Sequence, residues 1–112
     1  MKTDENFGSV RSFAFRAPRI ATNFSFLLEV IATGERYEAI CTDISEDGLA
    51  AEVHGLAPKT QVIMRILVPG NTLPLQIQGS VENSKDERCG INFLYSSPEE
   101  RKRVQVFIQS IS

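Results

Sequence analysis

The chain has 112 residues, of which 42% are hydrophobic and 23% are charged, a balance typical of one globular domain that buries a core without disulfides or metals. A formal net charge of −2 argues against a general nucleic-acid binder, since such proteins usually carry an excess of basic residues. The first residues lack the apolar run of a signal peptide, and no apolar stretch approaches the roughly 20 residues of a transmembrane helix.

The amino-terminal part of the chain is first polar and then basic. Residues 1–10 predict a flexible N-terminus. The segment that follows, residues 10–20, contains a proline and three arginines, Arg11, Arg16 and Arg19. This composition opposes a regular strand, so we expect a basic loop that is ordered by itself or by a ligand, with a solvated cationic tail as the alternative. Residues 1–24 carry a net charge of +2 and the remainder −4, which favours a small anionic partner or an acidic protein patch over a long polyanion.

Six runs of alternating polar and apolar residues predict β-strands. The runs cover residues 24–33, 36–44, 49–54, 61–68, 73–83 and 88–95. Short segments rich in Gly, Pro, Asn and Asp separate them and predict turns. Within the fifth and sixth runs, Gly79 and Gly90 predict a bulge or a bend.

The two cysteines, Cys41 and Cys89, lie apart from one another in two of these runs. They form no CxxC pair and show no metal-ligand spacing. We therefore predict buried reduced thiols and no metal site. Such cysteine usage is typical of a reducing cytoplasm, so we expect a cytoplasmic protein.

The carboxyl-terminal part of the chain changes from strand to helix spacing. Ser97, Pro98 and Glu100 form a capping box with proline at the first helical position. The apolar residues that follow lie at helical spacing on one face and predict a helix over residues 98–111. Because six short antiparallel strands avoid exposed edges best by closing, we predict a mostly all-β fold, a six-stranded antiparallel β-barrel with this helix packed on it.

The stretch Asp43-Ile44-Ser45-Glu46-Asp47-Gly48 is predicted to be a six-residue polar connection between the second and third strands. Asp43 can accept several hydrogen bonds, and the Ser45 hydroxyl can both donate and accept. Gly48 permits a positive φ or the close approach of a ligand. Such a set can read the edge of a polar planar molecule; a solvated hairpin turn is the alternative.

Residues 43–48 fit the DxSxxG motif, and in this respect the chain resembles PilZ domains, bacterial receptors for cyclic di-GMP. Three further features agree with the resemblance: an arginine-bearing segment upstream, the run Cys89-Gly90-Ile91-Asn92-Phe93, similar to the family's G-I-x-F strand, and the helix that begins after Ser97. The resemblance spans about residues 11–112, which predicts a single domain including the helix at 98–111.

The family also has an RxxxR motif, and here the chain departs from it. Arg19 stands where the second arginine belongs, but Phe15 occupies the position of the first. Arg16 can replace that arginine if the loop shifts by one residue; Arg11 lies further upstream.

The resemblance implies a module that binds cyclic di-GMP and transmits the signal by ordering the N-terminal Arg-bearing loop. It places Arg16 and Arg19 on guanine and phosphate, Asp43 and Ser45 on a guanine edge, and Gly48 in the shape of the loop. It implies a downstream protein partner of unknown identity, no cofactor, no nucleic-acid polymer and no insertion into a membrane.

The sequence leaves other functions open. A PilZ-like adaptor that binds a protein and not cyclic di-GMP is the main alternative, because RxxxR is degenerate. An enzyme is disfavoured: Asp43, Ser45 and His54 are the only conceivable triad, and the chain lacks a nucleophile elbow or P-loop. Asp43 and Asp47 alone make a poor metal site. A barrel for single-stranded nucleic acid would need aromatic platforms in a basic groove, whereas the aromatic residues of the strands are expected in the core.

Overall fold

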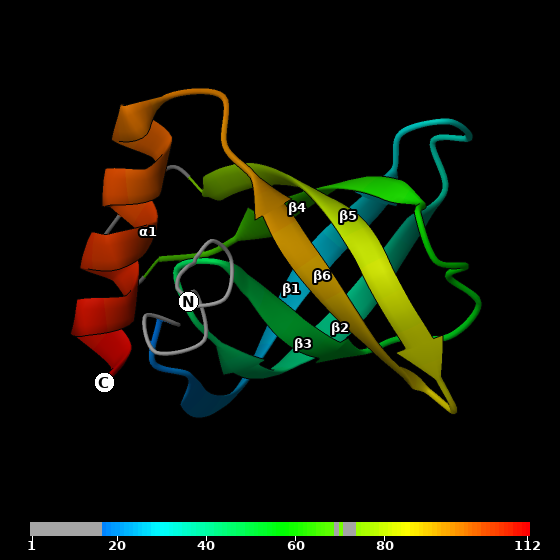
Figure 1. Cartoon of the computed structure of the whole chain (residues 1–112), viewed down its shortest axis with the longest axis horizontal. Coiled ribbons are helices and arrows are strands. Elements are labelled where there is room, and N and C mark those ends of the chain that lie inside the picture. Colours follow the sequence, from blue (N-terminus) through cyan, green and yellow to red (C-terminus); the bar gives the residue numbers. More distant parts are fainter. Residues whose placement is uncertain (1–16, 69, 71–73) are drawn as a thin grey trace, which may run out of the picture.

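A closed barrel of six antiparallel strands with one C-terminal helix forms the domain, as a computed structural model shows for residues 17–68, 70 and 74–112 (Figure 1). The strands are β1 (Ile20–Val30), β2 (Arg36–Ile44), β3 (Gly48–Glu52), β4 (Gln61–Ile66), β5 (Leu75–Lys85) and β6 (Arg88–Leu94), and the helix is α1 (Pro98–Ile111). Around the barrel the order is β1-β2-β3-β6-β5-β4, and β4 pairs with β1 to close it. The predicted fold class is therefore confirmed. The segment predicted to be flexible, residues 1–10, lies outside the described residues.

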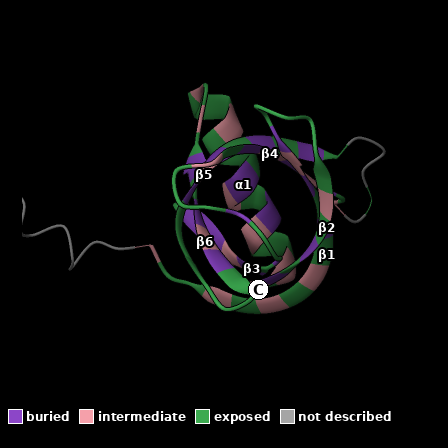
Figure 2. Cartoon of the chain, turned by 90° about the vertical axis from the view of Figure 1, so that its right-hand side faces the viewer, coloured by how far each residue is buried: buried purple, intermediate pink, exposed green. Residues whose placement is uncertain are grey.

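Alternating side chains from every strand fill the barrel. In β4, for example, Val62, Met64 and Ile66 are fully buried while the residues between them are partly exposed. Figure 2 looks along the barrel from the end opposite α1 and shows the ring of strands with buried and exposed positions alternating. The strand aromatics Phe26 and Phe93 belong to this core, as predicted.

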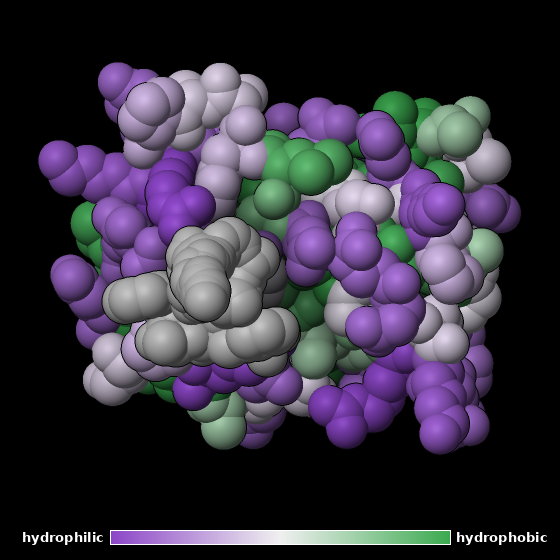
Figure 3. All heavy atoms as spheres, in the orientation of Figure 1, coloured by the Kyte–Doolittle hydropathy of each residue, from purple (hydrophilic) through white to green (hydrophobic). Residues whose placement is uncertain are grey.

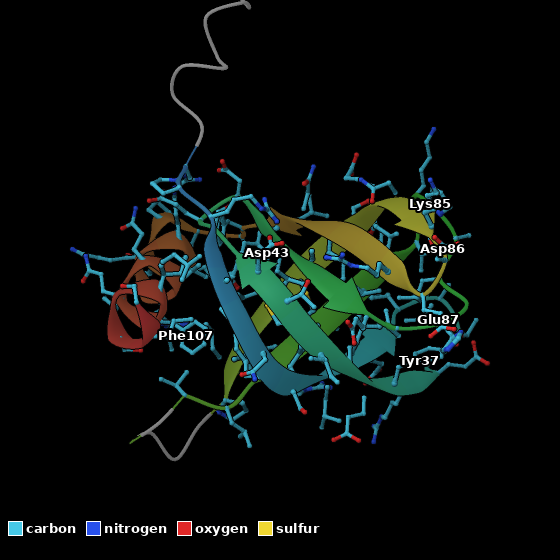
Figure 4. The ribbon with its side chains drawn as sticks, turned by 90° about the horizontal axis from the view of Figure 1, so that it is seen from below. Tyr37, Asp43, Lys85, Asp86, Glu87 and Phe107 are labelled. Carbon is cyan, nitrogen blue, oxygen red and sulfur yellow. The ribbon has the colours of Figure 1, made fainter. Side chains whose placement is uncertain are left out.

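The helix α1 closes one end of the barrel (Figure 1). Ser97 caps it by accepting a hydrogen bond from the backbone of Glu100 at 3.2 Å, and the Glu100 carboxylate accepts one from the backbone N–H of Ser96 at 2.8 Å. Phe107 is buried and meets Phe24 of β1 edge to face, with ring centroids 5.5 Å apart. In Figure 4 Phe107 points from α1 towards the strands. The predicted capping and the predicted bounds of the helix are confirmed.

Several sequence predictions about strand detail are wrong: apart from the second strand, each predicted run differs from the observed strand at one or both ends. The first strand begins at Ile20 rather than at 24, because Ile20 and Ala21 still pair with β2 ahead of a register shift. Gly79 carries no bulge: it pairs in register with both neighbours, and the shift in β5 falls between Val81 and Asn83. The lack of a side chain at Gly79 instead serves packing, since a Cβ there would lie 2.7 Å from side-chain atoms of Ile91 and Met64.

Gly90 lies opposite the irregularity, paired with Asn83 of the bulged strand. The fifth strand also continues to Lys85, through residues that the sequence assigns to the hairpin tip. All residues from 82 to 88 are exposed. In Figure 3 hydrophilic side chains cover the lower right of this face, where Figure 1 shows the β5–β6 hairpin.

Both cysteines are buried and free, as predicted. Burial raises the pKa of the Cys41 thiol to about 11, and it also raises the pKa of Cys89. No helix of the described residues is both long and apolar enough to cross a membrane.

Candidate functional site

The β2–β3 connection is tighter than the sequence indicates. Asp43 and Ile44 are the last residues of β2 and Gly48 is the first of β3, so the loop is three residues long and not six. The backbone N–H of Ser45 donates to the carbonyl of Gly48 at 2.8 Å and closes the turn. Strand pairing on both sides therefore fixes the positions of the motif residues.

A bulge in β2 turns Asp43 outward. Cys41 pairs with Ala51 and Asp43 with Ala50, so Thr42 is an extra residue between them. Cys41 and Ile44 are buried on either side, whereas Thr42 and Asp43 are both partly exposed. A bulge re-aims side chains in this way and is over-represented beside functional sites.

The Asp43 carboxylate and the Arg19 guanidinium form an ion pair. Nε of Arg19 donates to Oδ1 of Asp43 at 2.7 Å, and Nη2 of Arg19 also contacts that oxygen. The register of β1 explains their meeting, because Ala21 pairs with Asp43 and Arg19 lies two residues earlier. The pair is accessible, with 52% of the Arg19 side chain and 30% of the Asp43 side chain exposed. The structure thus brings together two of the five predicted site residues from positions 24 apart.

Ser45 has a role within the loop itself. Only 1% of it is exposed, and its Oγ accepts a hydrogen bond from the backbone N–H of Asp47 at 3.1 Å. This is the local turn that a serine side chain often stabilises. Its hydroxyl proton is not consumed by this bond, and Ser45 still lines the groove described below.

Gly48 is required by the neighbouring strand. Its φ is not positive. A Cβ at Gly48 would lie 2.2 Å from the backbone oxygen of Ile91 in β6. The close approach expected of a ligand is therefore made by β6, and Gly48 shapes the loop by letting β3 and β6 pair.

A groove of about 670 Å³ runs along the outside of the β3–β6 pair. One end is formed by Arg19, Ser45 and Asp47, the floor includes Ala50, and the other end is formed by Lys85 and Arg88 of the hairpin. A volume of this order suits a drug-sized ligand. In Figure 4 Lys85 lies at the end of the barrel opposite α1, and Asp43 lies nearer the helix. No pattern in the sequence indicated Lys85 and Arg88. Only the register of β3 with β6 shows that they line the same groove as the motif residues.

The helix α1 holds the loop from its other side. Nη2 of Arg101 lies 2.9 Å from Oε1 of Glu46 and 3.5 Å from Oδ1 of Asp47. Gln105 also donates to the Glu46 carboxylate at 3.2 Å. The Tyr95 hydroxyl donates to the Glu46 carbonyl at 2.5 Å, and the Arg101 guanidinium lies over the Tyr95 ring at 5.5 Å. Burial raises the pKa of Tyr95 to about 12. These contacts were also missed, because nothing in the sequence links residues 46 and 101.

The remaining candidates do not come together. Arg16 lies outside the described residues. His54 lies beyond the end of β3 and contacts Glu87 at 3.3 Å, whereas Asp43 contacts Arg19 and Ser45 bonds to the backbone of Asp47. The conceivable Asp43–Ser45–His54 triad is therefore not assembled. Among the described residues no group of three or more His, Cys, Asp and Glu side chains could hold a metal ion.

Solved structures with the same fold are PilZ proteins of low sequence identity. The PilZ domain of CeSA from a cellulose-synthesising bacterium is 14% identical, with a TM-score of 0.74 over 85% of this chain and 98% of that one. MrkH of K. pneumonia in complex with c-di-GMP is 16% identical, with a TM-score of 0.67 over 86% of this chain and 51% of that one. YcgR of Escherichia coli, also in complex with c-di-GMP, is 17% identical, with a TM-score of 0.66 over 86% and 45%.

At these identities the likeness establishes a shared fold, and the chain spans about half the length of MrkH and YcgR. Among curated proteins, no sequence matches. The PilZ domain family model matches residues 11–110, which includes the β2–β3 loop, the barrel and nearly all of α1. The chain belongs to the PilZ domain family.

Proposed function

We propose that this domain binds cyclic di-GMP in the groove along β3 and β6, with Arg19 and Asp43 as its recognition pair. Membership of a family that includes cyclic di-GMP receptors supports the proposal. The observation that carries it is the exposed Arg19–Asp43 pair, held by strand register beside a groove of about 670 Å³. The proposed activity is binding, with no catalytic step.

The chemistry of the pair matches that of the ligand. A guanine base presents O6 and N7 as acceptors, which an arginine fork can bind bidentately. Its N1–H and N2–H₂ groups are donors that suit the Asp43 carboxylate. Arg19 and Asp43 each satisfy the other in the free protein, so the ligand has to replace that contact.

This exchange is energetically favourable. An exposed ion pair is worth up to about 1 kcal/mol, whereas a bidentate contact to a base contributes about 1–3 kcal/mol. Ser45 adds a hydroxyl at the same end of the groove. In this proposal Arg16 supplies a further guanidinium from the N-terminal arm, and ordering of the Arg-bearing arm that precedes Arg19 passes the signal to a protein partner.

The experiment is a calorimetric titration of cyclic di-GMP into the wild type and into Arg19→Ala and Asp43→Ala. Each substitution should weaken binding about tenfold to a hundredfold, with thermal unfolding of the free protein little changed because the pair is exposed. Arg36→Ala is the matched control: Arg36 is an exposed arginine paired with Glu29 at the other end of the β1–β2 pair, and it does not line the groove, so its loss should leave affinity unaltered. Unchanged affinity in either site variant would refute the assignment.

One observation favours a second candidate, a protein-interaction adaptor that binds no cyclic di-GMP. Two of the three motif residues have tasks within the fold: Ser45 stabilises the turn, and Gly48 admits β6. Their presence is therefore compatible with a barrel that has no ligand. Thermal melts separate the candidates, because a ligand that binds only the folded state raises the melting temperature. An unchanged melting temperature at millimolar cyclic di-GMP would favour the adaptor.

A further inference from the structure

A second arginine lies beside the Arg19–Asp43 pair, and it comes from the barrel wall. Nη2 of Arg88 in β6 donates to Oγ1 of Thr42 in β2 at 3.2 Å. The strand β3 lies between β6 and β2, so the Arg88 and Thr42 side chains and the hydrogen bond between them bridge two strand spacings, about 10 Å. Ala50 of β3 lines the same groove, and its small side chain leaves room for Arg88.

The bulge in β2 supplies the hydroxyl to which Arg88 donates its hydrogen bond. Thr42 is the extra residue of that bulge and precedes Asp43, whose carboxylate holds Arg19. The two guanidinium groups therefore lie on either side of the same short piece of β2. Both Arg19 and Arg88 line the groove.

Within the part of the chain that the structure describes, no neighbouring carboxylate engages the guanidinium of Arg88. Lys85 lies opposite Arg88 across the hairpin, and Glu52 lies opposite it in β3. Two further carboxylates line the groove, those of Glu82 and Asp86. Arg88 forms no ion pair with any of these three described carboxylates, and its side-chain hydrogen bond goes to the neutral hydroxyl of Thr42. The guanidinium therefore keeps N–H donors from which an anion in the groove can accept hydrogen bonds.

We infer that Arg88 is a ligand-binding residue that supplies a further guanidinium to the cyclic di-GMP site, from the barrel wall and on a phosphate. Its positive charge comes from β6, whereas the family pattern has both arginines in the N-terminal segment. Lys85, a point charge beside it, suits phosphate better than a base edge. The inference rests on the proposed function.

The test is a titration of cyclic di-GMP into Arg88→Ala, Arg88→Lys and wild type. Arg88→Ala should weaken binding about tenfold to a hundredfold, and Arg88→Lys should fall between the two, since it keeps the charge and loses the fork. Arg65→Ala is the matched control. Arg65 also bridges neighbouring strands, to Glu29 and Gln76, on another wall of the barrel, and its loss should leave affinity unchanged.

A further variant separates direct contact from positioning. Thr42→Val removes the hydroxyl that Arg88 contacts but keeps the guanidinium. If Arg88 binds the ligand, Thr42→Val retains wild-type affinity; if Arg88 only holds the bulge in place, Thr42→Val loses as much affinity as Arg88→Ala, and the inference fails. Wild-type affinity in Arg88→Ala overturns this inference alone. Absence of binding by the wild-type protein overturns the proposed function and this inference together.

Discussion

Replacing Gly48 by alanine is the sharpest test of how the motif loop is built. A Cβ at this position would lie 2.2 Å from the backbone oxygen of Ile91, well inside the 3.4 Å at which ordinary van der Waals contact begins. The obstacle is backbone and cannot rotate away. It is also held in place, because the N–H of Phe93 donates to the carbonyl of Asp47 at 2.9 Å beside this glycine. The substitution has to push β3 and β6 apart.

The expected cost outweighs the usual benefit of removing a glycine. Overpacking of this kind costs about 3 kcal/mol, while the smaller entropy of the unfolded chain returns about 0.5–1 kcal/mol. The net loss in the free energy of unfolding is about 2 kcal/mol, which lowers the melting temperature of a domain this size by about 10 °C. The assay is thermal and urea unfolding of the free protein, followed by circular dichroism.

The control is Gly90→Ala in the neighbouring strand. There the nearest atoms belong to the Asn83 side chain at 3.2 Å, which can move, so the change should stay within about 1 kcal/mol. If the melting temperature of Gly48→Ala lies within about 2 °C of the wild-type value, strand packing does not require this glycine. The expectation that Gly48 allows the close approach of a ligand would then stand again.

Two predictions concern protonation. Burial raises the pKa of Tyr95 from 10.0 to about 12, so the folded state keeps a proton that the unfolded chain loses. The free energy of unfolding should therefore fall as the pH rises from 10 to 12. Tyr95→Phe should flatten this slope in urea titrations and cost about 1 kcal/mol at neutral pH, since the Glu46 carbonyl loses its donor; an unchanged slope would contradict the assignment. Cys41 and Cys89 are buried, and burial raises the pKa of both thiols. Iodoacetamide at pH 8 should therefore modify them only after denaturation, which mass spectrometry can measure. Rapid labelling of the native protein would contradict this prediction.

Local patterns predicted the elements whose signals are local. The second strand and the helix have the predicted bounds, 36–44 and 98–111. A run that alternates over most of its length marks the strand, and a capping box marks the start of the helix. The predicted first strand begins four residues too late, because Pro18 and the arginines around it are not typical of a strand. Ile20 belongs to β1 because it pairs with Ile44. The irregularity of β5 was assigned to Gly79, whereas pairing with β6 places it after Val81.

In the candidate site, too, the sequence predicts what depends on local motifs and misses what depends on long-range strand pairing. The sequence identified Asp43 and Arg19 through their motifs, and the structure places them in contact. It could not distinguish a serine that stabilises its own turn from one that awaits a ligand, because both uses require the same hydroxyl. Arg88 carries no local signal. Its place in the groove depends on the long-range pairing of β3 with β6, in which Glu52 lies opposite Arg88.

The contact between Arg101 and Glu46 links the β2–β3 loop to α1. Coupling between two binding events is reciprocal. If a ligand at this loop changes the free energy with which α1 packs on the barrel, a protein that binds α1 must change the affinity for that ligand by the same factor.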